Sequence, residues 1–368
     1  MFDPRIEKMA EVIVDFSLEV RRGDLLRIRS TTAAEPLILA AYRQALARGA
    51  NVVTTVDLPG QEELFYRYAD DEQLTWVSPV EQLLTERCDC VLRINALTNT
   101  QALAAVDPDR TRRHQSALAG ATSLFGQRAA RGELRWTGTL FPTAAFAQAA
   151  EMSLSDYQDF VFNACRLNET DPVAAWNAQR DMQQRLIDWL TPRDEVRIVG
   201  PDTDLTLSIQ GRSWANSYGK RNFPSGEVFT GPIETSASGT IRFTYPALVG
   251  GREVQDIRLW FENGEVVKAT AARNEEYLLK MLASDDGARR LGELGIGANF
   301  GITRFTKSIL FDEKIGGTIH LALGRSYPET GGVNQSAIHW DMVCDLRQGG
   351  EVTVDGEVFL RDGKFQVS

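Results

Sequence analysis

The sequence has few of the residues and segments that define several large classes of protein. The 368-residue chain contains four cysteines and three histidines, and no run approaches the roughly 18–20 apolar residues that a membrane span requires. Four scattered cysteines are too few for a disulfide framework, which excludes a small secreted scaffold. Acidic residues outnumber basic residues by 50 to 40, giving a net charge of −10. Duplex-binding proteins are usually basic, so we expect no nucleic-acid partner.

Two further sequence signals are missing. The first residues, Met1 to Glu7, lack the basic-then-apolar order of a secretory signal. We therefore expect a cytoplasmic protein without a membrane association. No glycine-rich phosphate loop follows any predicted strand, and this absence argues against a dinucleotide or nucleoside triphosphate as cofactor.

The composition is that of an ordinary globular protein, with 43% hydrophobic and 24% charged residues. The length favours two domains. In the first half, helical patterns alternate with extended, β-branched runs, which is typical of a largely parallel sheet covered by helices. The predicted strands are residues 25–29, 51–56, 90–95 and 134–139. We predict an α/β N-terminal domain over residues 1–192.

The second half consists of short extended segments separated by turns. Gly200-Pro201-Asp202 lies between two alternating runs, and Asn263-Gly264 is the strongest short hairpin signal in the chain. A helix is predicted from about residue 274 to residue 291. We predict an α+β C-terminal domain over residues 193–368, with a mostly antiparallel sheet that carries a metal site.

Two of the histidines suggest that metal site. Strand alternation places His339 and Asp341 on the same face of an extended segment. His320 lies in a second extended segment, and a position on the neighbouring strand would bring both imidazoles together. Two imidazoles and a carboxylate are a common set of ligands for zinc, cobalt or iron.

Additional carboxylates would allow a second metal ion. Glu227, Glu293 and Glu313 are flanked by apolar residues and glycines, which permit close approach of the backbone. The alternative is that the histidines are ordinary core or surface residues and that the glutamates cap turns. His114 follows a cluster of arginines and is either a helix-surface residue or a group that faces the substrate.

Several C-terminal motifs together resemble the thermophilic aminopeptidase family of metallopeptidases, which includes aminopeptidases T, S and II. The matching strings, in chain order, are residues 223–232 (FPSGEVFTGP), residues 288–293 (ARRLGE), residues 310–313 (LFDE), His320 with Gly324 and Tyr327, and Asn334-x-Ser336-x-x-His339-x-Asp341. The resemblance is close from about residue 195 onward and loose before it.

The resemblance implies a peptidase that removes N-terminal residues from peptides with a water activated by two divalent ions, either zinc, cobalt or manganese. It also implies a homodimer. The implied metal ligands are Glu227, Glu293, His320, His339 and Asp341, with Glu293 as the bridge between the ions. Glu313 is implied as a sixth ligand or as the general base, a role for which Glu234 is the alternative. Tyr327 is implied to stabilise the oxyanion.

A second enzyme class has similar sequence features, namely the mononuclear iron, ring-cleaving 2,5-dihydroxypyridine dioxygenases. His320, His339 and Asp341 would satisfy a two-histidine, one-carboxylate iron site, and His114 could then act as an acid or base. Glu227 and Glu293 argue for the peptidase, because one iron ion does not need their extra negative charge. A non-catalytic metal-binding or interaction protein is the third alternative.

Overall fold

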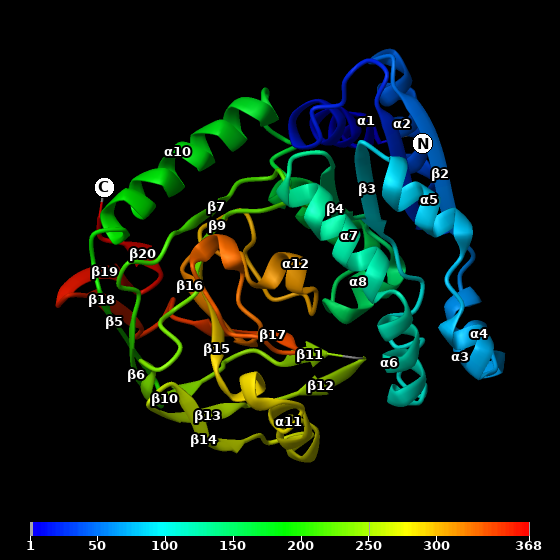
Figure 1. Cartoon of the computed structure of the whole chain (residues 1–368). Coiled ribbons are helices and arrows are strands. Elements are labelled where there is room, and N and C mark those ends of the chain that lie inside the picture. Colours follow the sequence, from blue (N-terminus) through cyan, green and yellow to red (C-terminus); the bar gives the residue numbers. More distant parts are fainter. Residues whose placement is uncertain (1–2, 250, 368) are drawn as a thin grey trace. The chain divides into compact units, whose positions relative to one another are not determined.

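The computed structural model describes residues 3–249 and 251–367, which form two compact units (Figure 1). The first unit consists of Met1–Val173 and Gly219–Phe223, and the second of Ala174–Tyr218 and Pro224–Ser368. The predicted domain boundary near residue 192 lies at the end of helix α10 (Pro172–Leu190), whereas the units divide near the start of this helix.

The first unit is built on a five-stranded sheet with the strand order β2-β1-β3-β4-β8. All its strand pairs are parallel, as the sequence predicts. The strands are β1 (Leu25–Thr31), β2 (Asn51–Asp57), β3 (Cys90–Asn95), β4 (Arg135–Leu140) and β8 (Asn222–Phe223).

Helices connect these parallel strands, because a parallel pair needs a long crossover connection. The connecting helices are α2 (Glu35–Ala47), α3 (Gln61–Tyr68), α4 (Asp71–Thr75), α5 (Pro79–Arg87), α6 (Pro108–Ala117), α7 (Ala119–Ala130), α8 (Ala144–Ala149) and α9 (Leu154–Ala164), whereas α1 (Pro4–Glu11) precedes β1. Helix α9 shows why the local sequence begins a helix where it does. The hydroxyl of Ser153 accepts a hydrogen bond from the backbone N–H of Asp156 at 3.1 Å and so caps the first turn.

The second unit contains antiparallel sheets, again as predicted. An eight-stranded sheet has the order β14-β13-β10-β6-β5-β18-β19-β20, a five-stranded sheet the order β17-β16-β15-β9-β7, and β11 pairs with β12. The strands of the eight-stranded sheet are β5 (Glu195–Gly200), β6 (Thr203–Ser208), β10 (Ser238–Arg242), β13 (Arg258–Glu262), β14 (Glu265–Thr270), β18 (Glu351–Val354), β19 (Glu357–Arg361) and β20 (Lys364–Phe365).

The remaining strands of the second unit include those of the five-stranded sheet, which we call the site sheet. Its strands are β7 (Ala215–Ser217), β9 (Glu227–Thr230), β15 (Leu291–Gly297), β16 (Thr318–Gly324) and β17 (His339–Asp345). The short pair consists of β11 (Ala247–Val249) and β12 (Arg252–Val254).

Both predicted hairpin turns are present. β5 and β6 pair on either side of Pro201-Asp202, and β13 pairs with β14 across Asn263-Gly264. Asn263 and Gly264 have φ angles of 51° and 81°. Two successive positive φ angles match the right-handed twist of the flanking strands, which explains the Asn-Gly sequence.

The predicted helix over residues 274–291 is too long. Helix α11 spans only Glu275–Leu282, and Leu291 already begins β15. The carboxylate of Asp285 accepts hydrogen bonds from the backbone N–H groups of Gly287 and Ala337, at 3.0 and 2.7 Å. These bonds turn the chain out of the helix and direct it into the site sheet.

One apolar cluster fills the core of the second unit, with side chains from the eight-stranded sheet and the site sheet. Leu186, Ile187 and Leu190 of α10 belong to this cluster, which explains why most of α10 groups with the second unit. All four cysteines are buried as thiols. Within the part of the chain that the structure describes, no helix has the length and apolarity needed to span a membrane.

Candidate metal centre

The polar face of the site sheet gathers acidic and imidazole side chains from separate segments. Glu227 comes from β9, Glu293 from β15, His320 from β16, and His339 and Asp341 from β17. Glu313 follows the short helix α12 (Ile309–Asp312). The strands β16 and β17 are neighbours, as expected for the two histidines. The alternate residues of these strands, such as Leu294, Leu321 and Met342, are buried in the apolar core.

Small residues in register make room for these side chains. Gly295 lies opposite His320, and Ala322 lies opposite both Glu293 and Asp341. A Cβ atom on Gly295 would lie 2.0 Å from Cε1 and 2.1 Å from Nε2 of His320. No side chain fits there, so the imidazole occupies the space above the glycine.

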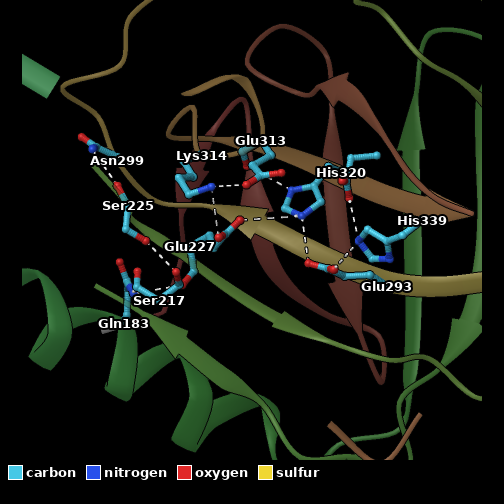
Figure 2. A network of polar contacts seen from close by, with 11 residues as sticks. Gln183, Ser217, Ser225, Glu227, Glu293, Asn299, Glu313, Lys314, His320 and His339 are labelled. Carbon is cyan, nitrogen blue, oxygen red and sulfur yellow. Dashed lines mark hydrogen bonds and ion pairs between the residues drawn. The ribbon is translucent and has the colours of Figure 1, made fainter. Parts of the chain in front are cut away.

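The side chains form two groups of three that could each hold a metal ion. One group consists of Glu227, Glu313 and His320, and the other of Glu293, His339 and Asp341; within each, the ligand atoms lie within 4.8 Å of one another. Glu293 contacts both imidazoles (Figure 2). Its Oε1 lies 3.1 Å from Nε2 of His320, and its Oε2 lies 3.3 Å from Nε2 of His339.

Backbone carbonyls orient both imidazoles. Nδ1 of His320 lies 3.0 Å from the carbonyl oxygen of Glu313, and Nδ1 of His339 lies 2.7 Å from that of Arg325. Because a carbonyl only accepts, each Nδ1 carries a proton and donates it. In the neutral ring this leaves the lone pair on Nε2, the atom that faces the carboxylates and is free to ligate a metal.

A cation fits this donor set. Oε2 of Glu227 is buried and receives no hydrogen bond from any residue that the structure describes. Its neighbour in the group is Nε2 of His320, at 3.7 Å. A buried carboxylate oxygen without a donor is costly. A divalent ion between these atoms would satisfy both the oxygen and the imidazole lone pair, and carboxylate with imidazole is a donor set that zinc, cobalt and manganese accept.

Lys314 is part of the centre and was not identified from the sequence. Its side chain is fully buried, and Nζ forms ion pairs with Glu227, at 3.3 Å, and with Glu313. Burial alone would lower the pKa of this lysine, but the charges of Glu227 and Glu313 outweigh it and raise the pKa. The sequence feature that could have identified Lys314 is its position directly after Glu313, a candidate ligand, in a mostly apolar segment. Lysines are mostly found on the surface, so nothing in the local sequence indicated that this one is buried.

The carboxylates favour protonated imidazoles when no metal is bound. Burial alone would lower the pKa of His320 and His339, but the contacts with Glu293, and for His339 with Asp341, raise these values to about 10 and about 11. Burial acts in the opposite direction on carboxyl groups, and it raises the pKa of Glu313 to about 8. Metal binding must therefore displace protons from the site.

A buried amide and hydroxyl network fixes the backbone that presents Glu227 (Figure 2). The amide nitrogen of Gln183, on α10, donates to the carbonyl of Glu227 at 3.0 Å. The hydroxyls of Ser217 and Ser225 lie 2.6 Å apart, and Asn299 donates to the carbonyl of Ser225 at 2.8 Å. The position of Glu227 is therefore set by tertiary contacts on both sides of β9.

Tyr327 lies beside the second group. Its ring packs edge to face against His339, with the ring centroids 5.0 Å apart, and against Phe229 at 5.5 Å. The hydroxyl makes no hydrogen bond to the described residues. Burial raises the pKa of Tyr327, and the nearby carboxylates raise it further, so the hydroxyl stays protonated at neutral pH.

Two other residues considered in the sequence have different surroundings. The carboxylate of Glu234 accepts hydrogen bonds from Arg212, at 2.6 Å, and from the backbone N–H of Val333, at 2.8 Å. Both its oxygens are engaged in holding the turn after Tyr327, which leaves Glu313 as the better candidate for a base. His114 lies on α6 in the first unit, where Nδ1 contacts the carbonyl of Leu74 at 2.9 Å.

Comparison with known proteins gives matches along nearly the whole chain. Residues 2–365 match the family described as thermophilic metalloprotease (M29). Aminopeptidase 2 of Geobacillus stearothermophilus is 29% identical, covering 99% of this chain and 98% of that protein. Aminopeptidase T of Thermus thermophilus is 27% identical, covering 96% and 95%.

Solved structures share the fold. Wild-type AmpT from Thermus thermophilus has a TM-score of 0.87 at 24% identity and covers all of both chains. A 2,5-dihydroxypyridine dioxygenase from Pseudomonas putida KT2440 has a TM-score of 0.62 at 14% identity, covering 98% of this chain and 96% of that chain.

Gly295→Ala should weaken metal binding, because the new methyl group would displace the ring of His320. Disturbing the orientation of a metal ligand typically lowers metal affinity by about 10–100-fold, and we expect a loss of this size in a competitive chelator titration. The matched control is Gly200→Ala on β5, where a Cβ would meet its nearest atom at an ordinary 3.4 Å. Equal metal affinity of Gly295→Ala and the unmodified protein would contradict this account of the glycine.

The metal-free protein should lose stability as the pH rises from 7 toward 10. The folded-state pKa values of His320 and His339 lie above the usual 6.5, so the folded state binds protons that the unfolded state has released. Each such proton lowers the free energy of unfolding by about 1.4 kcal/mol per pH unit. Thermal unfolding in a chelator at several pH values measures this slope.

Two histidine variants locate the source of this pH dependence. His339→Asn should flatten the slope, whereas His114→Asn, in the other unit, should leave it unchanged. A melting temperature of the metal-free protein that stays constant or rises with pH would show that the imidazoles are not held in the charged form.

Proposed function

This chain belongs to the thermophilic metalloprotease (M29) family, and we propose that it is an aminopeptidase that removes N-terminal residues from peptides with two divalent ions. The observation that carries the proposal is the pair of three-residue groups on the site sheet, joined by one carboxylate. The proposed ligands are Glu227, Glu293, His320, His339 and Asp341, and Glu313 lies beside Glu227 and His320 as the proposed base. Zinc, cobalt and manganese all suit this set of oxygens and nitrogens.

Glu293 is the proposed bridge between the ions. Its two oxygens point to different imidazoles, at 3.1 and 3.3 Å, and each imidazole belongs to a different group. The charge of the centre also supports divalent cations. The carboxylates of Glu227, Glu293 and Asp341 outnumber the ammonium of Lys314 when the imidazoles are neutral, and bound cations would compensate the excess negative charge. Uncompensated buried charge is strongly unfavourable.

When bound, the two ions would activate a water molecule and polarise the scissile carbonyl. The chain's own residues then have separate tasks. Oε1 of Glu313 is held by Lys314, and Oε2 makes no hydrogen bond with the described residues. We assign this second oxygen the task of accepting a proton from the attacking water and delivering it to the leaving amine.

Tyr327 and the carboxylates account for the remaining steps. The protonated hydroxyl of Tyr327 can donate a hydrogen bond to the oxygen of the scissile carbonyl as negative charge develops there. The acidic set also offers a partner for the free α-amino group of a peptide. A requirement for that amine would restrict the reaction to N-terminal residues.

The dioxygenase reaction is less well supported. An iron site of that kind needs only His320, His339 and Asp341, and it leaves the buried carboxylates of Glu227 and Glu293 without a task. The likeness to the dioxygenase structure, at 14% identity, concerns the fold alone.

Two further proposals concern the oligomeric state of the protein and its location in the cell. We propose a homodimer, on the resemblance to the aminopeptidase family, and the mass in solution tests it. We also propose a cytoplasmic location. Four buried cysteine thiols agree with a reducing compartment, where thiols are kept reduced.

Metal analysis combined with Glu293→Gln tests the function. We expect about two divalent ions per chain and hydrolysis of an aminoacyl 4-nitroanilide but not of its N-acetylated form. Glu293→Gln should lose metal and lower kcat/KM by at least about 100-fold, as expected when a metal-bridging charge is removed. Glu262→Gln, an exposed carboxylate on β13 of the same unit, is the matched control. One iron ion per chain, unchanged in Glu293→Gln, would instead support the oxygenase.

Tyr327→Phe tests the oxyanion assignment. The change keeps the ring that packs on His339 and Phe229 and removes only the hydroxyl. We expect kcat to fall by about 10²–10³-fold, with little change in KM or in metal content, because the hydrogen bond is stronger in the transition state than in the ground state. An unchanged kcat/KM would remove Tyr327 from the reaction.

A further inference from the structure

The first unit contains a cavity whose lining includes none of the proposed metal ligands. It has a volume of about 860 Å³ and is lined by residues of β1, β3 and helices α3, α5, α6 and α7, among others. Pockets for small molecules usually have volumes of about 300–1,000 Å³. All of its lining residues belong to the first unit, whereas the metal centre lies in the second.

Three arginines form the floor of this cavity. Arg27 and Arg29 alternate on β1, and Arg29 lies opposite Arg93 of β3 in the parallel register. All three side chains line the cavity. The faces of a parallel sheet are usually apolar because helices cover them, so a row of guanidinium groups on one face is not explained by the fold.

Among residues 3–249 and 251–367, one carboxylate forms ion pairs with these arginines. Glu81, on α5, accepts two hydrogen bonds from Arg27, at 2.9 and 2.6 Å, and its other contact is with Arg29 at 4.0 Å. Arg93 forms no hydrogen bond or ion pair with residues 3–249 or 251–367, and its guanidinium lies 4.7 Å from the centroid of the Phe125 ring. The floor therefore carries about two positive charges in excess.

The electrostatic environment of Arg93 is consistent with an excess of positive charge on the cavity floor. The surrounding protein lowers the pKa of Arg93 through burial, and the neighbouring charges of Arg29 and Arg27 lower it further. Three other carboxylates line the cavity, on β2 and α3, namely Asp57, Glu62 and Glu63. None of these three carboxylates contributes to the pKa shift of Arg93. Among the described carboxylates, Glu81 is the one that does, and it raises the pKa.

Part of the cavity wall is apolar and aromatic. This part includes Phe65 and Trp76, together with Leu84, Leu118 and Phe125. The site thus combines a cationic floor with walls suited to a hydrophobic group. Guanidinium groups bind carboxylates and phosphates through paired, charge-assisted hydrogen bonds.

We propose that this cavity binds a small organic anion, in which a carboxylate or phosphate contacts Arg93 and Arg29 and an apolar or aromatic body packs against the walls. The proposal does not rest on the proposed peptidase function, because the cavity shares no residue with the metal centre. Arg27 contributes by fixing Glu81, and its bidentate ion pair leaves it few donors for a ligand.

Calorimetric titration of the metal-loaded protein tests the proposal with three probes: N-acetylphenylalanine, phenyl phosphate and the neutral N-acetylphenylalanine amide. None has a free α-amino group, so none is a substrate of the proposed reaction. We expect at least one of the two anions to bind with a dissociation constant of about 1 mM or lower and the amide to bind at least about tenfold more weakly. Comparing the two anions distinguishes a carboxylate from a phosphate ligand.

Variants locate the binding. Arg93→Met keeps an apolar stem beside Phe125 and removes the charge, and it should weaken anion binding by at least about tenfold, as should Arg29→Gln. Arg112→Gln is the matched control, since this α6 arginine is exposed and does not line the cavity. Hydrolysis of the aminoacyl 4-nitroanilide should be unchanged in all three. The proposal is overturned if neither anion binds, if the amide binds equally well, or if Arg93→Met binds like the unmodified protein.

Discussion

The structure depends on placing four carboxylates and two imidazoles on one largely buried face of a sheet. Like charges in a low-dielectric environment repel strongly, and such a set is tolerable only with compensating positive charge. Among the residues that the structure describes, Lys314 supplies a cation, and its ammonium pairs with Glu227 and Glu313. Protons on the imidazoles or metal ions on the proposed ligands supply the rest. The polar networks around β9 fix the backbone at Glu227, and Gly295 leaves room for the ring of His320. Both features keep the carboxylates and imidazoles close together.

The sequence predicted the parts of the centre that depend on strand alternation. The pairing of His339 with Asp341 on one face follows from a period of two residues, and the four parallel strands of the first unit follow from β-branched runs between helical segments. Alternation alone cannot set the order of strands in a sheet or their register. The position of Glu293 beside both imidazoles depends on β15 lying between β16 and β9, and here the prediction placed a helix end instead.

The residues that the sequence did not reveal are those whose task depends on tertiary contacts. Lys314 and Gln183 are polar residues of common types, and nothing in their local sequence distinguishes a buried partner from an exposed one. The same holds for Arg27, Arg29 and Arg93, which in a strand pattern look like solvent-facing positions. They line a cavity because helices of the first unit enclose that face of the sheet. Motif resemblance identified the proposed ligands, but it carried no information about the groups that neutralise or position them.

The order of the strands also has a consequence for biosynthesis. Glu227 is the first proposed ligand to be synthesised and Asp341 is the last, and β15, β16 and β17 lie one after another beside β9 in the order in which they are made. A nascent chain that has not yet added β17 to the sheet lacks His339 and Asp341. A partly made copy therefore has no complete centre, and an unfinished peptidase cannot degrade the newly made proteins around it.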